Sequence, residues 1–243
     1  MPDQRRHRGP HPEDARLFAP DQIPAMQTAT TELSWLLSRG YVLASSLKLV
    51  GDRHGLTARQ RTAVSRCTCT EEQRRRREAH QLSPADLKGQ SLWIDGYNVL
   101  TSIEAALSGG VLLRGQDGCI RDMASMHGSY RKVSETVPAL RMIGEHLQQL
   151  GVRGVRWLLD APVSNSGRLR SLMLELATEH GWNWEVDLVP DPDPILAAAT
   201  EIIASADSEI LNAAERWYPL ANDVIGDRFN ETFAGLVPAS RPL

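Results

Sequence analysis

The stretch Ser91-Leu-Trp-Ile-Asp-Gly-Tyr-Asn-Val-Leu100 decides the fold of this chain. Its apolar run, Leu92 to Ile94, ends at once in Asp95, and a glycine follows. Short apolar runs bounded by turn residues are typical of buried strands in a parallel sheet. Ligands of open α/β sheets bind at the carboxyl ends of the strands, where Asp95 would lie. A carboxylate there favours a positive partner, usually a divalent cation, although Asp95 could also simply cap the next helix or turn.

The same arrangement recurs downstream. Apolar runs at 154–160, 182–189 and 202–206 are each followed by polar turns and by segments with helical spacing. Alternation of this kind predicts an α/β fold, a three-layer α/β/α domain with a mostly parallel sheet.

Four acidic residues fall at or just beyond the ends of these apolar runs: Asp95, Asp160, Asp193 and Asp207. Because the carboxyl ends of parallel strands meet at one edge of a sheet, we expect these carboxylates to converge and to bind Mg²⁺ or Mn²⁺. Such an ion can activate water and stabilise the oxygens of a phosphodiester. Taken singly, Asp193 and Asp207 are equally typical of helix N-caps.

The part of the chain ahead of this domain is predicted to be helical. Residues 1–21 are rich in arginine and proline without an apolar face, so we expect a disordered basic tail. Helical spacing of apolar residues then predicts a helical module over 22–82, with Thr57 as an N-cap. Residues 83–90 read as a linker, and the α/β domain occupies 91–243.

Charge is distributed unevenly between the two parts. Residues 1–90 hold 15 Lys and Arg against 10 Asp and Glu, whereas residues 91–243 hold 12 against 20. A basic module beside an acidic site suits contact with a phosphate backbone. The candidate nucleic-acid-binding residues are Arg59, Arg61, Arg66, Arg74, Arg75, Arg76 and Arg77. The alternative is a solvated helix whose glutamates pair internally with these arginines.

The expected compartment is the cytoplasm. No run of about eighteen apolar residues exists, so no membrane partner is expected, and the N-terminus lacks the apolar core of a secretory signal. Cys67, Cys69 and Cys119 are too few and too irregularly spaced for a disulfide framework or a complete zinc site. Reduced thiols are the expectation.

Two polar segments are further candidates. Ser164, Asn165, Ser166 and Arg168 lie between a predicted strand and a predicted helix, and this chemistry suits phosphate, although an ordinary helix entry fits as well. The long segment 103–131 is a candidate lid. Its His127 could serve as a general acid or base, but a lone histidine is more often a surface residue.

The chain resembles a known family at three places. The run from Trp93 to Leu100 looks like the opening strand of PIN-like nuclease domains of the NYN branch, which begin with a similar Asp-Gly-aromatic-Asn turn. The run from Ala204 to Ile210 resembles their late acidic element, and Pro190 to Asp193 falls where such domains carry a central acid. The layout, helical over 22–80 and nuclease-like over 90–227, is similar to a group of uncharacterised bacterial and archaeal proteins.

This resemblance implies a PIN-like fold, Mg²⁺ or Mn²⁺ as the metal, and RNA as the substrate. Asp95, Asp193 and Asp207 would bind the metal, and Asn98 or Asp160 would orient the attacking water. The chain departs from the family in its long segment 103–131 and in lacking the usual Thr/Ser-Asn/Asp pair directly before Asp207.

Three classes of function therefore stay open. The first is a metal-dependent ribonuclease, with RNA as partner and self-association into a homodimer left open. The second is a non-catalytic nucleic-acid-binding protein with the same fold. The third is a phosphate-handling enzyme acting on small molecules through Asp95, Asp160 and the 164–168 loop.

Overall fold

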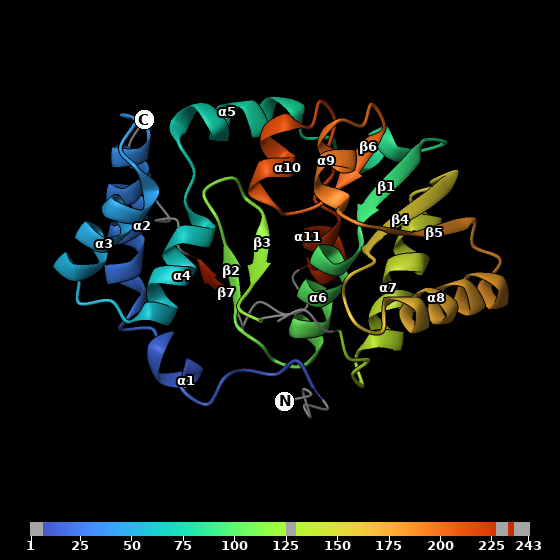
Figure 1. Ribbon diagram of the computed structural model, residues 1–243, viewed down its shortest axis with the longest axis horizontal. Coiled ribbons are helices and arrows are strands. Elements are labelled where there is room, and N and C mark those ends of the chain that lie inside the picture. Colours follow the sequence, from blue (N-terminus) through green and yellow to red (C-terminus); the bar gives the residue numbers. More distant parts are fainter. Residues whose placement is uncertain (1–6, 125–129, 227–232, 236–243) are drawn as a thin grey trace.

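The computed structural model describes residues 7–124, 130–226 and 233–235. Its centre is a four-stranded parallel sheet in the order β5-β4-β1-β6 (Figure 1). β1 (Ser91–Asp95) lies between β4 (Gly154–Asp160) and β6 (Ile202–Ala204), and β5 (Trp184–Val189) forms the outer strand beside β4. The predicted strands and the predicted α/β class are confirmed.

Helices cover both faces of this sheet, which gives three layers. The first face packs on α6 (Gly96–Leu107), α7 (Thr136–Gln149), α8 (Ser166–His180) and α11 (Leu220–Ile225). The opposite face packs on α9 (Pro192–Ala197) and α10 (Ser208–Ala213). Alternation along a strand explains the division: Leu159 belongs to the first core, and Leu158 to the second.

Helix α6 begins directly after Asp95. Gly96 allows this start, because a Cβ at Gly96 would stand 2.4 Å from Leu159 Cδ2 and 2.8 Å from the Leu158 carbonyl oxygen. The closeness of helix and sheet places Asp95 and Asn98 at the same strand end.

The helical module consists of α2 (Ile23–Leu37), α3 (Leu43–Arg53), α4 (Ala58–Cys67) and α5 (Glu71–His80). Thr57 caps α4 as predicted, and it forms a capping box with Gln60. Helix α5 extends across the top of the molecule from the helical module to α10 (Figure 1).

A small second sheet joins the two parts of the chain. β2 (Leu112–Arg114) pairs antiparallel with β3 (Ile120–Asp122) and parallel with β7 (Phe233–Gly235). The hairpin lies between the helical module and the large sheet (Figure 1). Leu113 packs in the core of the helical module, whereas Leu112 packs in that of the α/β domain. The expectation of a lid is thus wrong for the described part of 103–131; His127 lies outside the described residues.

The expectation of a disordered tail is wrong for residues 7–21. Helix α1 (Asp14–Leu17) forms there, and the Arg8 side chain is only 7% exposed. Arg8 forms an ion pair with the fully buried Glu104 and lies 4.9 Å from the centre of the Tyr130 ring. The region expected as a linker is also partly ordered, since η1 (Pro84–Leu87) buries Leu87 completely.

The three cysteines are free and buried. Burial raises the pKa of the Cys67 thiol to about 12 and that of Cys69 to about 11. Thiols held protonated in this way are poor nucleophiles. No helix in the described ranges is long and apolar enough to cross a membrane.

Candidate functional site

The candidate site lies where the order of the strands reverses. From β1 the chain builds β4 and β5 outward on one side, and it then returns to place β6 on the other side. In open α/β sheets, ligands bind at the carboxyl ends of the strands at such a switch point. Asp95 ends β1, and Ser205 and Asp207 follow β6, so the sequence-predicted acids Asp95 and Asp207 meet there.

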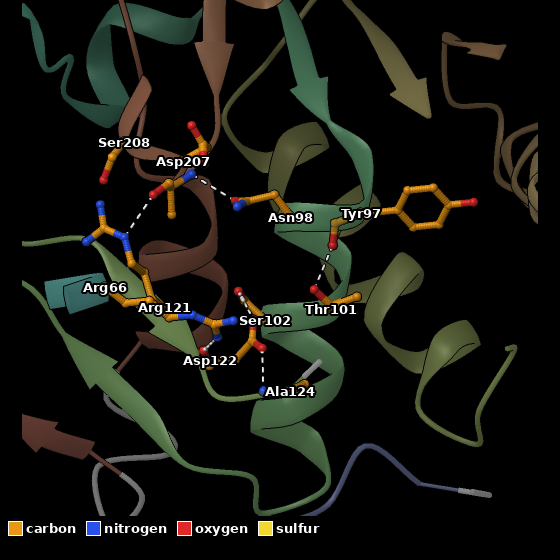
Figure 2. A pocket seen from close by; sticks show the side chains of 11 residues that line it. Arg66, Tyr97, Asn98, Thr101, Ser102, Arg121, Asp122, Ala124, Asp207 and Ser208 are labelled. Carbon is orange, nitrogen blue, oxygen red and sulfur yellow. Dashed lines mark hydrogen bonds between the residues drawn. The ribbon is translucent and has the colours of Figure 1, made fainter. Parts of the chain in front are cut away.

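A short hydrogen-bond network joins the two strand ends. The Ser205 hydroxyl donates to Asp95 Oδ2 at 2.7 Å, and the Asp207 amide donates to Ser205 Oγ at 2.9 Å. The Ala206 amide donates to Asn98 Oδ1 at 2.8 Å (Figure 2). Asn98, expected to orient substrate or water, therefore uses its carbonyl oxygen to hold the segment that carries Asp207.

Ser205 is the residue that the sequence prediction missed. The comparison with PIN-like domains looked for a hydroxyl directly before Asp207, and the hydroxyl stands one residue earlier. The sequence held part of the signal, because Ser205 directly follows the apolar residues of β6. That β6 pairs with β1 through Ile94 and Ala204 is known only from the structure.

The electrostatics of the acidic edge, defined as Asp95, Asp160, Asp193 and Asp207, are those of uncompensated carboxylates. Asp95 is 7% exposed, and burial raises its pKa to about 7, with Asp193 and Asp207 adding to the effect and Ser205 opposing it. Burial also raises the pKa of Asp193, and Asp207 and Asp191 raise it further. The pKa of Asp160 is raised by burial and then by Asp191. In the described structure, none of the four pairs with Lys, Arg or His.

The helix-cap alternative also holds for Asp207. Its Oδ1 accepts from the amides of Glu209, at 2.8 Å, and Ile210, at 3.3 Å, and so caps α10. Oδ2 has no hydrogen-bond partner among the described residues. In α9 the cap is Asp191, which accepts from the amide of Asp193, so the exposed Asp193 carboxylate is not used as the cap.

The residues fit a hydrated cation better than a fully protein-bound one. Within the described ranges, no three His, Cys, Asp or Glu side chains are arranged to hold a metal ion by themselves. Mg²⁺ commonly keeps several waters and binds through one or two carboxylates together with substrate phosphates. The buried Asp95, with its raised pKa and no basic partner, has the chemistry of such a ligand.

A buried ionic junction, consisting of Arg77, Asp117 and Arg121, lies behind the acidic edge. Arg77 Nη1 donates to Asp117 Oδ2 at 2.5 Å, and Arg121 makes two bonds to the same carboxylate, at 2.9 and 2.6 Å. Burial alone would raise the pKa of Asp117, but the attraction of Arg121 and Arg77 outweighs it and lowers this pKa to about 2. Arg121 Nε also donates to the Ala206 carbonyl at 2.9 Å, so the junction supports the segment before Asp207.

Arg77 was predicted to contact nucleic acid, and this prediction is wrong. Its side chain is 1% exposed and donates hydrogen bonds to Asp117, Asn212 and the Ser208 carbonyl. The run of four arginines thus contains one residue that belongs to the core.

The other predicted arginines differ in their partners. Five of them lie within ion-pair distance of a carboxylate: Arg59 with Asp14, Arg61 with Asp52, Arg74 and Arg75 with Glu71, and Arg76 with Glu215. The pairs of Arg74 and Arg75 with Glu71 agree with the alternative of an internally paired helix. Arg59, Arg61 and Arg76 instead pair with carboxylates of other segments. Arg66 is the exception: its Nη1 donates to the Asp122 carbonyl at 2.6 Å, and it has no carboxylate partner in the described residues.

The candidate phosphate loop lies at the end of β4, next in sequence to Asp160. Helix α8 begins at Ser166, and Asn165 has a φ of 71°. Asn165 Nδ2 donates to the Tyr130 carbonyl at 2.9 Å, and the Ser166 hydroxyl donates to the Ala161 carbonyl at 3.3 Å. Ser164 and Arg168 are exposed, so two of the four predicted side chains have intramolecular partners and the anion site stays a prediction.

Comparisons with known proteins divide the chain between residues 80 and 84, close to the linker expected from the sequence at 83–90. Residues 25–80 match a protein of unknown function (DUF434), and residues 84–223 match a domain of unknown function (DUF5616). The chain is 28% identical over 189 residues to the uncharacterized protein MJ0935 of Methanocaldococcus jannaschii, covering 78% of this chain and 90% of that protein. No solved structure matches the chain. The chain therefore belongs to the DUF5616 family, and its helical part carries the DUF434 match.

Proposed function

We propose that this protein is a metal-dependent ribonuclease and that its α/β domain is PIN-like, of the NYN branch. The strand order supports this proposal, because it places the first and last strands of the large sheet side by side. The Asp-Gly-Tyr-Asn turn after β1 and the acidic segment after β6, on which the resemblance rests, meet at that point.

The observation that carries the proposal is the connection from Asp95 through Ser205 to Asp207. The Ser205 hydroxyl donates to the Asp95 carboxylate and accepts from the Asp207 backbone amide, which brings two carboxylates distant in sequence to one place. No basic side chain of the described residues neutralises these carboxylates. Such an arrangement is unfavourable on its own, since burial and like charge both raise the pKa of Asp95. A bound cation removes both costs.

Mg²⁺ or Mn²⁺, bound through one or two of the carboxylates of Asp95, Asp193 and Asp207 and otherwise hydrated, would supply activation of water and charge stabilisation at phosphorus. Within the chain, Ser205 keeps Asp95 oriented and Asn98 fixes the segment before Asp207. Asp160, at the same strand edge, is the carboxylate left to orient the attacking water. Asn98 therefore has a different role from the one expected from the sequence: it binds the backbone amide of Ala206 instead of orienting the attacking water.

The test is cleavage of labelled single-stranded and structured RNA in Mn²⁺ or Mg²⁺ by wild type, Asp95→Asn and Asp207→Asn. We expect either substitution to lower the rate by roughly two orders of magnitude or more, because each removes a carboxylate from the ion. Melting temperatures measured in parallel show whether the variants are folded.

Asp187→Asn is the matched control. Asp187 lies on β5 of the same sheet, but it pairs with Arg156 at 2.7 Å and should leave the rate unchanged. Cleavage that persists in both Asp95→Asn and Asp207→Asn would reveal a contaminant. If wild type binds RNA and cleaves none of it, the non-catalytic binding function takes the place of this proposal.

A further inference from the structure

A cavity of about 300 Å³ adjoins the acidic edge. Its walls come from four places in the sequence: α4, α6, β3 and the segment that opens α10. The residues that matter for its chemistry are Arg66, Asn98, Ser102, Asp122, Asp207 and Ser208 (Figure 2). Since Asn98 and Asp207 line it, the cavity is continuous with the proposed catalytic site. Its volume is at the lower end for ligand pockets and suits a single nucleotide unit.

Two guanidinium groups, those of Arg66 and Arg121, line this cavity, and they differ in how many N–H donors are already used within the protein. Arg121 is 8% exposed, and its donors go to Asp117 and to the Ala206 carbonyl. Arg66 is half-buried and donates one hydrogen bond, to the Asp122 carbonyl. A guanidinium carries five N–H donors, so Arg66 retains donors for a ligand.

Arg66 binds the carbonyl of Asp122, whose side-chain carboxylate is engaged elsewhere. Asp122 Oδ2 accepts from the Ser102 hydroxyl at 2.7 Å, and Oδ1 accepts from the Ala124 amide at 2.8 Å. Figure 2 shows both bonds, with Arg66 reaching toward the backbone of Asp122 instead of its carboxylate. Arg66 is therefore the cation of the described cavity that no acidic side chain neutralises.

We propose that this cavity binds a backbone phosphate of the RNA strand next to the one that is cleaved, and that Arg66 holds it. Arginine matches phosphate through paired N–H···O bonds, which fixes orientation as well as charge. The proposal rests on the proposed function, because it takes RNA as the occupant. It also gives the helical module a direct role: α4 contributes a residue to the site of the α/β domain.

The carboxylates of Asp122 and Asp207 line the same cavity, so the pocket is not positive overall. Binding of a phosphate in this cavity should therefore depend strongly on Arg66. Binding to a generally basic surface would tolerate the loss of one arginine. This dependence on one residue is what the experiment measures.

The experiment compares binding of a short fluorescein-labelled single-stranded RNA by fluorescence anisotropy. The parent protein is the full chain with Asp95→Asn, so that the RNA stays intact. Three variants add Arg66→Ala, Arg66→Lys or Arg75→Ala to this parent. Arg75 is the matched control, an exposed arginine of the same module that pairs with Glu71 at 3.3 Å. Melting temperatures are measured for each protein, and Arg66→Lys retains the charge if Arg66→Ala proves poorly folded.

We expect Arg66→Ala to weaken binding about tenfold. The slope of the logarithm of the affinity against the logarithm of the salt concentration should become about 0.7 less steep, the value for one phosphate contact on a single strand. Arg66→Lys should keep that salt dependence but lose part of the affinity, because an ammonium cannot bind phosphate in the paired geometry. Arg75→Ala should match the parent.

Equal losses in Arg66→Ala and Arg75→Ala would overturn the proposal, as would an unchanged salt dependence in Arg66→Ala. Complete displacement of RNA by millimolar inorganic phosphate would assign the cavity to free phosphate and would also overturn it. Because binding is measured without cleavage, an Arg66-dependent affinity supports this cavity even if wild type fails to cleave RNA. Conversely, cleavage that depends on Asp95 leaves the proposed function standing if Arg66→Ala binds like the parent.

Discussion

Asp95 and Asp117 are both buried aspartates, and their surroundings are opposite. Asp95 is 7% exposed with no basic partner in the described structure, and its pKa is raised to about 7. Asp117 is 5% exposed between Arg77 and Arg121, and its pKa is lowered to about 2. Burial is thus the same in both, and the partners decide the outcome.

The ionic junction and the acidic edge therefore differ in role: the first stabilises the fold, and the second has the electrostatics of a binding site. At the ionic junction, the protein supplies the counter-charges itself, so the charges serve to fix the fold. At the acidic edge the protein leaves charge uncompensated, which is the usual sign of a place where a ligand completes the electrostatics. The two regions touch at the Ala206 carbonyl, which accepts from Arg121, while the Ala206 amide binds Asn98.

Breaking the ionic junction should have the largest effect. Asp117→Asn leaves Arg77 and Arg121 buried without their counter-charge, and such losses cost about 3–5 kcal/mol. Urea unfolding at pH 7 measures this change. Lowering the pH should imitate it, because the stabilisation from a depressed carboxyl pKa is present above the unfolded value of 3.8 and is lost toward about 2.

Asp52→Asn is the control for that experiment. Asp52 also binds two cations, Lys48 at 2.6 Å and Arg61 at 2.8 Å, but on the surface. We expect little change, since exposed ion pairs contribute little. Equal destabilisation by the two variants would mean that burial of the junction is not what gives Asp117 its importance.

Asp95 should behave in the opposite sense when no cation is present. Its folded pKa of about 7 lies above the ordinary 3.8, so the folded state holds the extra proton and loses stability as the pH rises from about 4 to 7. Asp95→Asn cannot ionise, and in EDTA it should be more stable than wild type at pH 8. One pKa unit corresponds to about 1.4 kcal/mol, so the gain is bounded at about 4 kcal/mol.

The measurement is thermal or urea unfolding of both proteins in EDTA at several pH values. The difference between them should shrink toward zero as the pH falls to about 4, where Asp95 is protonated in either state. Millimolar Mn²⁺ should reverse the ranking at pH 8 by stabilising wild type alone. A difference that does not vary with pH would show that Asp95 is not the group that titrates.

The smallest expected effect comes from Ser205, which connects the Asp95 carboxylate to the backbone amide of Asp207. Ser205→Ala removes the hydroxyl bond to the charged form of Asp95 and the acceptor of the Asp207 amide. We expect a cost of about 1 kcal/mol in Mn²⁺-dependent stabilisation, the usual worth of one hydrogen bond. Ser205→Thr should restore it, and a full loss in the threonine variant would point to packing instead of the hydroxyl.

The sheet and its acidic edge could be predicted from the sequence because both depend on local signals. An apolar run that stops at an aspartate reports a strand and its end together, as Asp95 and Asp160 show. The start of α6 at Gly96 could not be predicted, since it depends on how closely Leu158 and Leu159 approach a residue without a Cβ.

Ion pairs over long distances in the sequence could not be predicted in the same way. Arg77 meets Asp117 forty residues later, and Arg8 meets Glu104. Neither pair has a periodicity or spacing that distinguishes it, so a basic run looked like a binding surface and a basic tail looked disordered. Only the three-dimensional packing separates Arg66 from the arginines that are already paired.

The β2–β3 hairpin, which packs in both cores, makes the two parts of the chain depend on each other. Leu113 and Asp117 fall within the DUF5616 match at 84–223, yet Leu113 packs in the core of the helical module and Asp117 needs Arg77 from α5. A gene fragment coding for 84–223 alone would expose Leu113 to water and leave Asp117 without one of its two cations. Both parts are therefore needed to complete these contacts, and we expect genomes that encode this α/β domain to retain the helical part in the same reading frame.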